Sequence, residues 1–166
     1  MYTNNLDQYF KSVANHSLLT REQEVELAKK IEKGDIEAKK LMIKSNLRLA
    51  ISIAKKYSKY GQDIEDLIQE SNIGLMKAVD KFDWRKGFKF STYACWWIKQ
   101  AITRYITTNN SILNVPSHTI ANARKVFQIM KEYEEEFGVN PTNEEISEIL
   151  GINEKHVKQA ISSIKT

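Results

Sequence analysis

The feature that most constrains the fold is an unbroken run at residues 88–106, FKFSTYACWWIKQAITRYI. No proline or glycine follows Ser91 before Pro116, and a serine hydroxyl is a good helix N-cap. The run therefore predicts a helix over about residues 92–107, with Ser91 as its cap. At about 100° per residue, one face of this helix is an ordinary core stripe, made by Ala94, Ile98, Ala101, Ile102, Tyr105 and Ile106.

The opposite face of the predicted helix mixes aromatic rings with polar and cationic groups. It holds Tyr93, Trp96, Trp97, Lys99, Gln100, Thr103, Arg104 and Thr107. Rings among cations and amide donors are typical of a surface that contacts bases and the phosphates beside them. The alternative is that a neighbouring segment buries the two tryptophans, and helix geometry alone leaves both interpretations open.

Charge is distributed unevenly along the sequence. The formal net charge is only +4, yet residues 84–131 and 38–62 contain lysines and arginines and no aspartate or glutamate. Such segregation produces a local positive field in a protein of modest net charge. A basic strip beside stacking aromatics is expected of a nucleic-acid groove, particularly a single-stranded one, and favours an exposed tryptophan face.

The rest of the sequence favours an all-α fold. Thr20 with Gln23, and Thr142 with Glu145, form capping boxes that predict two further helix starts. Helices are also expected over residues 36–60, 63–82 and 117–137, and in two short pieces that are joined across Gly151 and resemble a helix-turn-helix. We expect a multi-helix domain at residues 1–114 and a small three-helix domain at 115–166.

A polar stripe on the helix expected over residues 63–82 contains a methionine. Glu65, Gln69, Asn72 and Met76 lie within about 60° of one another, and Ile73 is beside them. This pattern indicates a docking surface for another helix, while a solvated face with one stray methionine is the alternative.

Several function classes lack the residues that they need. The histidines are far apart, no glycine-rich phosphate loop occurs, and the acids that follow Asp63 lack calcium-loop spacing. Nothing therefore indicates an enzyme, a cofactor or a metal site. The single cysteine, Cys95, fits a reducing cytoplasm, and neither a signal peptide nor an apolar run of about 20 residues occurs. We expect a soluble, cytoplasmic protein.

The run DLIQESNIGLMKAVDKFDWRKGFKFSTYACWWIKQAITR closely resembles the most characteristic region of bacterial RNA polymerase sigma factors, in the housekeeping-like sigma-seventy family. The resemblance extends upstream through LLTREQEVELAKKIEKGD and NLRLAISIAKKY, and downstream through VPSHTIANARK and the helices after it. It implies a detachable subunit that gives core RNA polymerase its promoter specificity and opens promoter DNA at the minus-ten element.

The resemblance also implies roles for individual residues. Contacts to the coiled coil of the largest catalytic subunit would come from Gln69, Glu70, Asn72 and Met76. Gln100 and Thr103 would read the upstream base pair of the minus-ten element, with Trp96 and Trp97 wedged against the last paired step. The pocket for the flipped adenine of the non-template strand would consist of Tyr93, Phe82, Lys86 and Phe88.

Further contacts follow from the same resemblance. Lys89 and Arg104 would contact and position the backbone, and His118 would contact DNA just upstream of the minus-ten element. The downstream flipped thymine and the spacer beyond it would be held by Phe10, Lys11, Leu18 and Glu24. Ala121 stands where a glutamate usually helps to read the extended motif, which puts that specificity in doubt.

The resemblance begins at the early region and ends after the third region. The acidic autoinhibitory segment, the linker into the active-site cleft and the domain that reads the minus-thirty-five element are therefore expected to be missing. This leaves two alternatives open. One is a truncated sigma-like protein that occupies core polymerase without productive initiation, and the other is a stand-alone helix-turn-helix regulator.

Overall fold

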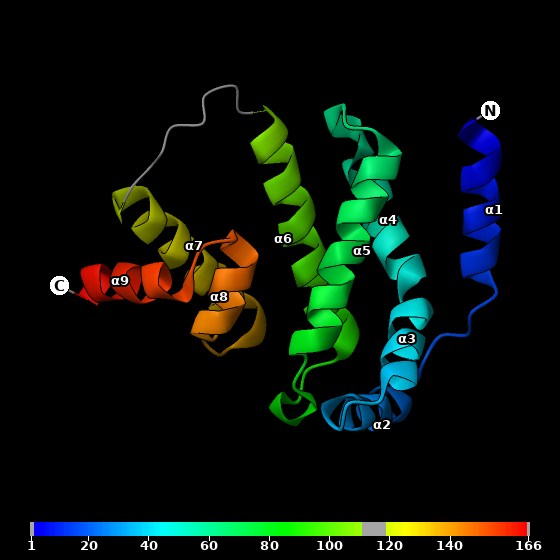
Figure 1. Ribbon diagram of the computed structural model, residues 1–166, viewed down its shortest axis with the longest axis horizontal. Coiled ribbons are helices and arrows are strands. Elements are labelled where there is room, and N and C mark those ends of the chain that lie inside the picture. The colour runs from blue at the N-terminus through cyan, green and yellow to red at the C-terminus, as the bar shows by residue number, and fades with distance from the viewer. Residues whose placement is uncertain (1, 111–118, 166) are drawn as a thin grey trace. The chain divides into compact units, whose positions relative to one another are not determined.

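The structure is a computed structural model that describes residues 2–110 and 119–165. Within these residues the chain forms helices and no strand, which confirms the all-α prediction (Figure 1). The chain divides into two compact units, Met1–Thr107 and Thr108–Thr166. The boundary predicted at residue 114 lies outside the described residues. No helix among the described residues has the length and apolar character that crossing a bilayer requires.

The first unit contains five complete α-helices, most of a sixth and two 3-10 helices. They are α1 (Tyr2–Ala14), α2 (Arg21–Glu32), α3 (Ile36–Ser45), α4 (Leu47–Tyr57), η1 (Ser58–Tyr60), α5 (Ile64–Lys81), η2 (Trp84–Lys86) and α6 (Phe90–Asn110). The capping box that begins α2 is confirmed, because Thr20 Oγ1 accepts from Gln23 N at 3.2 Å and Gln23 Oε1 accepts from Thr20 N at 2.9 Å.

The single helix predicted over residues 36–60 is wrong, because the chain breaks at Asn46. This residue has φ −115° and ψ 5°, and it separates α3 from α4. Its side-chain Nδ2 donates to the carbonyl oxygen of Met42 at 2.8 Å. A side-chain amide that bonds the backbone one turn back offers the chain an alternative to helix continuation. The predicted stop at Gly61 is confirmed, since this residue adopts φ 84°.

The core of the first unit lies along α5 and α6. Side chains from α3 to α6 that are almost completely buried include Met42, Ala50, Ala54, Leu67, Leu75, Ala78, Ala94, Ile98 and Ile102. The two helices approach each other closely at Gly74, where an added Cβ would lie 3.0 Å from both Ile98 Cα and the Trp97 carbonyl oxygen. Glycine therefore permits a backbone approach that any larger side chain would obstruct.

The second unit is built from α7 (Thr119–Phe137), α8 (Asn143–Leu150) and α9 (Glu154–Lys165). The capping box of Thr142 and Glu145 is confirmed at the start of α8. Glu145 also has a second function, because its Oε2 accepts a 2.8 Å hydrogen bond from the Tyr133 hydroxyl in the core. One buried carboxylate thus stabilises both a helix end and the contact between α7 and α8.

Candidate nucleic-acid and polymerase-binding site

Helix α6, which carries most of the predicted DNA-contacting residues, starts two residues earlier than predicted. It begins at Phe90, so Ser91 lies inside the first turn and the prediction of a Ser91 cap is wrong. The carboxylate of Glu24, on α2, accepts a hydrogen bond from the Phe90 N–H instead. Burial raises the pKa of Glu24, and this bond and the nearby charges of Lys89 and Arg21 partly oppose that rise. Glu24 is thus a buried cap of α6 in this structure.

The aromatic face of α6 is not exposed. Tyr93, Trp97 and Trp96 retain only 1%, 2% and 8% of their accessible surface, so the prediction of an exposed face is wrong for these three rings. Phe88 stacks on Tyr93 with centroids 5.7 Å apart and planes inclined by 21°. Phe82 also packs on Tyr93, at 5.8 Å, and the two tryptophans meet edge to face at 6.3 Å. Rings supplied by the end of α5 and by the loop before α6 thus pack on Tyr93.

The polar residues predicted on the same face remain accessible. Lys99, Thr103 and Arg104 are exposed on α6, and Gln100 is half-buried. Before α6, Lys86 and Lys89 are exposed, while Phe82 and Phe88 are half-buried. The structure therefore brings ten of the predicted DNA-contacting residues onto α6 and the segment before it, as a buried aromatic cluster bordered by exposed polar groups.

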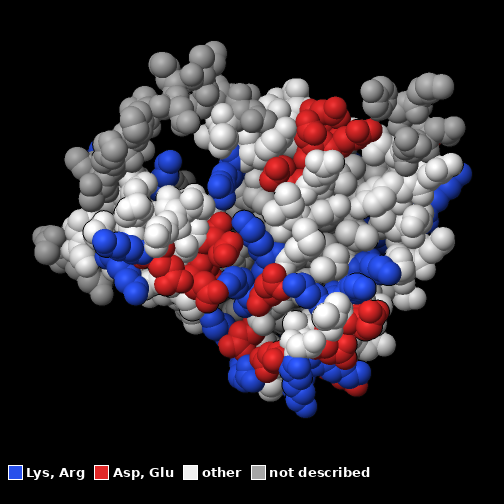
Figure 2. All heavy atoms as spheres, in the orientation of Figure 1, with Lys and Arg blue, Asp and Glu red and all other residues white. Residues whose placement is uncertain are grey.

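Acidic side chains from elsewhere in the fold approach the basic runs. Lys39 forms a 2.6 Å ion pair with Asp80 of α5, and Arg85 pairs with Glu32 of α2 and with Asp83. Figure 2 shows blue and red groups intermixed over α2 and the η2 turn, at the bottom of the view. Segregation of charge in the sequence is thus partly cancelled in space.

The predicted docking stripe lies on α5 and is partly exposed. Gln69 is exposed, and Ile73 and Met76 retain 40% and 41% of their surface. Glu70 and Asn72 are half-buried, and Asn72 Nδ2 donates to the Tyr9 hydroxyl of α1 at 3.1 Å. Tyr9 was not predicted from the sequence, because no local pattern indicates a partner 63 residues away.

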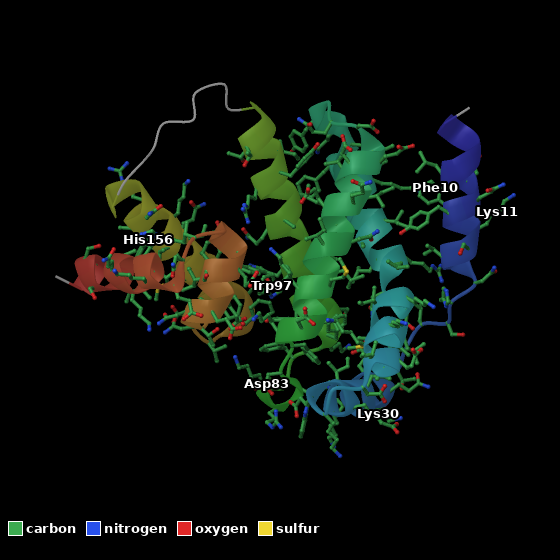
Figure 3. The ribbon with its side chains drawn as sticks, viewed as in Figure 1. Phe10, Lys11, Lys30, Asp83, Trp97 and His156 are labelled. Atoms are coloured by element: carbon green, nitrogen blue, oxygen red, sulfur yellow. The ribbon has the colours of Figure 1, made fainter. Side chains whose placement is uncertain are left out.

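The residues predicted to hold the downstream strand do not form one surface. Phe10 is half-buried and points from α1 toward α4, where Lys55 Nζ lies 4.4 Å from its ring centroid, whereas Lys11 points away (Figure 3). Leu18 is 70% exposed in the segment between α1 and α2. His118 lies outside the described residues. Lys55 was also missed from the sequence, where nothing pairs it with Phe10.

Three family models match successive parts of the chain. Sigma-70 factor region 1.2 matches residues 5–35, Sigma-70 region 2 matches residues 42–112 and Sigma-70 region 3 matches residues 121–166. The chain belongs to the sigma-70 family. The RNA polymerase sigma factors SigA of Listeria monocytogenes and of Listeria innocua are each 46% identical to it over 153 residues. These alignments cover 92% of this chain and 41% of each relative, so the chain spans about two fifths of the length of these curated relatives.

In this sigma-70 chain the candidate surfaces can be assigned to regions. The region 2 match includes α4, α5 and α6, and hence both the α5 stripe and the aromatic cluster. The region 1.2 match includes α2, whose Glu24 caps α6. Regions 1.2 and 2 are therefore joined directly at the start of the helix that carries the candidate DNA contacts. Among the described residues, no three His, Cys, Asp or Glu side chains form a potential metal-binding group.

Proposed function

We propose that this chain acts as a transcription-initiation subunit that binds core RNA polymerase, recognises the minus-ten element and nucleates DNA melting. The observation that carries the proposal is the pair of adjacent region 2 helices. Of these two helices, α5 presents the exposed side chains of Gln69 and Met76, and α6 presents polar groups beside an aromatic cluster. A unit of this kind contacts polymerase with one helix and promoter DNA with the next, and it needs no catalytic residue.

Recognition of the closed duplex is assigned to the polar side of α6. The Gln100 amide can both donate to and accept from a base edge, and Thr103 lies on the same side one turn away. Arg104 and Lys89 are exposed and suit phosphate contacts, which position the protein without reading sequence. In the second unit, His118 is proposed to contact the duplex immediately upstream.

Strand opening is assigned to the aromatic cluster. Extruding a base costs a few kcal/mol, and stacking it on a protein ring returns about 1–3 kcal/mol. Because Tyr93 is covered by Phe88 in this structure, capture of the flipped adenine requires that Phe88 move aside. Trp96 keeps the larger accessible edge of the two tryptophans, so we assign it the contact with the last base pair, with Trp97 supporting it from behind. Phe82 and Lys86 complete the adenine pocket.

Two further contacts complete the proposal. Phe10, Lys11 and Leu18 are assigned to the strand downstream of the captured adenine, and they lie on α1 or directly after it. Gln69, Glu70, Asn72 and Met76 are assigned to the coiled coil of the largest polymerase subunit. The exposed Ile73 lies between these four and adds apolar surface to the same patch.

The docking assignment is tested by replacing Gln69 and Met76 together with alanine. Both side chains are exposed, so the fold should persist while co-purification with core polymerase decreases. The matched control is Leu41→Ala on α3, because Leu41 is 46% exposed and lies outside the stripe. Undiminished binding by the double variant would show that the stripe is not the docking surface.

The function as a whole is tested by run-off transcription with core polymerase on a promoter that carries an extended minus-ten element. The expected result is a transcript that depends on the minus-ten sequence and on this chain. Polymerase binding without a transcript would favour the alternative of an occupying protein. Tight duplex binding without polymerase would favour the stand-alone regulator. Gln100→His should change the preference at the upstream base pair by about 1–3 kcal/mol and leave opening intact.

A further inference from the structure

The loop that joins α5 to α6, residues 83–89, is held by α2 from outside. We call these residues the capture loop, because Lys86 and Phe88 of the proposed adenine pocket belong to it, together with Lys89, which is assigned a phosphate contact. At the start of the loop, Glu32 accepts two hydrogen bonds from the Arg85 guanidinium, at 2.6 and 2.9 Å. This two-point geometry fixes the orientation of both groups. Arg85 also donates a hydrogen bond to Asp83 Oδ1 at 3.2 Å, which links the ion pair to the first residue of the loop.

The middle and the end of the capture loop are held by the same helix. Arg21 Nη2 donates to the carbonyl oxygen of Gly87 at 2.8 Å. Gly87 has φ 85°, a conformation that glycine adopts readily, so its backbone has little intrinsic preference for this geometry. Beyond the loop, the Glu24 carboxylate accepts from the Phe90 N–H and fixes the start of α6.

A cation–π contact completes the set. Lys29 Nζ lies 4.6 Å from the ring centroid of Trp84, and the Arg85 guanidinium is also 4.6 Å from it. The α2 residues in these contacts, Arg21, Glu24, Lys29 and Glu32, lie along one helix over three turns. They contact the loop at Trp84, Arg85 and Gly87, and they contact α6 at Phe90. Lys86, Phe88 and Lys89 lie between these contacts in the sequence.

We propose that α2 is a brace that positions the capture loop, with Arg21, Glu32 and Arg85 as positioning residues for adenine capture. This inference rests on the proposed function. The brace residues need not touch the base. Because they fix the backbone on both sides of Lys86 and Phe88, they hold the loop in place beside Tyr93 while the Phe88 side chain moves aside. Region 1.2 thereby contributes to base capture through region 2.

The test measures capture by the chain bound to core polymerase. The probe is a single-stranded non-template minus-ten oligonucleotide with 2-aminopurine in place of the flipped adenine, whose fluorescence falls when the base stacks. A second oligonucleotide is abasic at that position. The readout is the ratio of the two affinities together with the quenching. A loss of general DNA binding lowers both affinities, whereas a misplaced loop lowers the ratio.

The decisive variant is Glu32→Gln. It removes a negative charge, so electrostatics alone would tighten binding to both oligonucleotides. The brace predicts instead that the affinity ratio falls by about two- to fivefold, in line with the effect of an exposed ion pair. Arg21→Ala should lower it comparably, and the two effects should multiply in the double variant, since the groups hold different points of the loop. Arg85→Lys should restore part of the ratio that Arg85→Ala loses.

The matched control is Glu37→Gln, which breaks an exposed ion pair to Lys40 within α3 and should leave the ratio unchanged. If the unaltered chain shows no preference for the base over the abasic site, the proposed function fails, whatever the variants do. If it shows the preference and both Glu32→Gln and Arg21→Ala retain the full ratio and quenching, the brace is refuted while the proposed function stands.

Discussion

Trp97→Ala should strongly destabilise the first unit. Trp97 retains 2% of its surface, and a buried tryptophan removes about 150–250 Å² from water, which is worth about 4–6 kcal/mol at 25 cal/mol per Å². Measured Trp→Ala losses are about 3–5 kcal/mol. The indole N–H has no hydrogen-bond partner among the described residues, so deleting it also removes a penalty of about 1–3 kcal/mol. We therefore expect the lower end, about 3 kcal/mol.

The assay is urea unfolding followed by the amide signals of α5, because a global signal would mix the transitions of two units. Trp97→Phe keeps one ring and loses the N–H, so the opposing terms should leave a loss of about 1 kcal/mol. Lys99→Ala, at an exposed position on the same helix, should stay within about 0.5 kcal/mol. A loss below about 1 kcal/mol for Trp97→Ala would refute the burial argument.

The same variant separates support of the fold from strand opening, provided that it is assayed well below its unfolding midpoint. Trp97→Ala should slow the appearance of permanganate-reactive thymines on a duplex promoter. It should have little effect on a template that is already mismatched over the minus-ten element. Equal defects on both templates would show that Trp97 serves only the core.

Three further changes test other parts of the structure. Gly74→Ala should destabilise the first unit by about 1–2 kcal/mol in urea unfolding. Overpacking costs about 1–3 kcal/mol, and the better helix propensity of alanine offsets about 1 kcal/mol of that cost. A variant that is as stable as the unaltered chain, or more stable, would contradict the close approach of α5 and α6. Burial raises the pKa of Glu24, so the folded state binds the Glu24 carboxyl proton more tightly than the unfolded state does. The contribution of Glu24 to stability is therefore full below its ordinary pKa of 4.5 and falls as the pH rises above that value. Glu24→Gln should remove this part of the pH dependence of the unfolding free energy, measured by urea titration. The same pH dependence in the variant and in the unaltered chain would contradict this prediction. Tyr133→Phe should cost the second unit about 1–3 kcal/mol, read from amide signals of α8, because a buried carboxylate loses a partner.

Local sequence patterns predicted the helix ends that depend on neighbours in the chain. The pairs Thr20 with Gln23 and Thr142 with Glu145 lie three residues apart, so both partners are visible in one turn. The break at Asn46 was missed, because Leu47, Leu49 and Ile53 continue an apolar pattern across it. A single side-chain bond to the preceding turn decides the break, and periodicity does not report such a bond.

The candidate site was predicted in composition but not in exposure. The sequence places Tyr93, Trp96 and Trp97 on one helix face, and it cannot show that Phe82 and Phe88 pack on Tyr93 or that both tryptophans are buried. The cap of α6 and the brace were also invisible, because Glu32 and Arg85 are 53 residues apart and Arg21 and Gly87 are 66 apart. Helical periodicity orients each helix, and only tertiary packing determines which face is covered.

The stack of Phe88 on Tyr93 has a consequence for selectivity in the proposed mechanism. The chain's own ring occupies the surface that a captured adenine needs, and so acts as an internal competitor. An aromatic pair is worth about 0.5–1.5 kcal/mol beyond its buried area. The stack therefore keeps the conformation that can accept a base, with Phe88 moved aside, at a minor population. This weakens the apparent affinity for the base by about two- to tenfold. Stray single strands meet this penalty in full. A promoter strand that is already held by α6 and by polymerase overcomes it through its other contacts, so occupancy of the pocket reports that the rest of the promoter is in place.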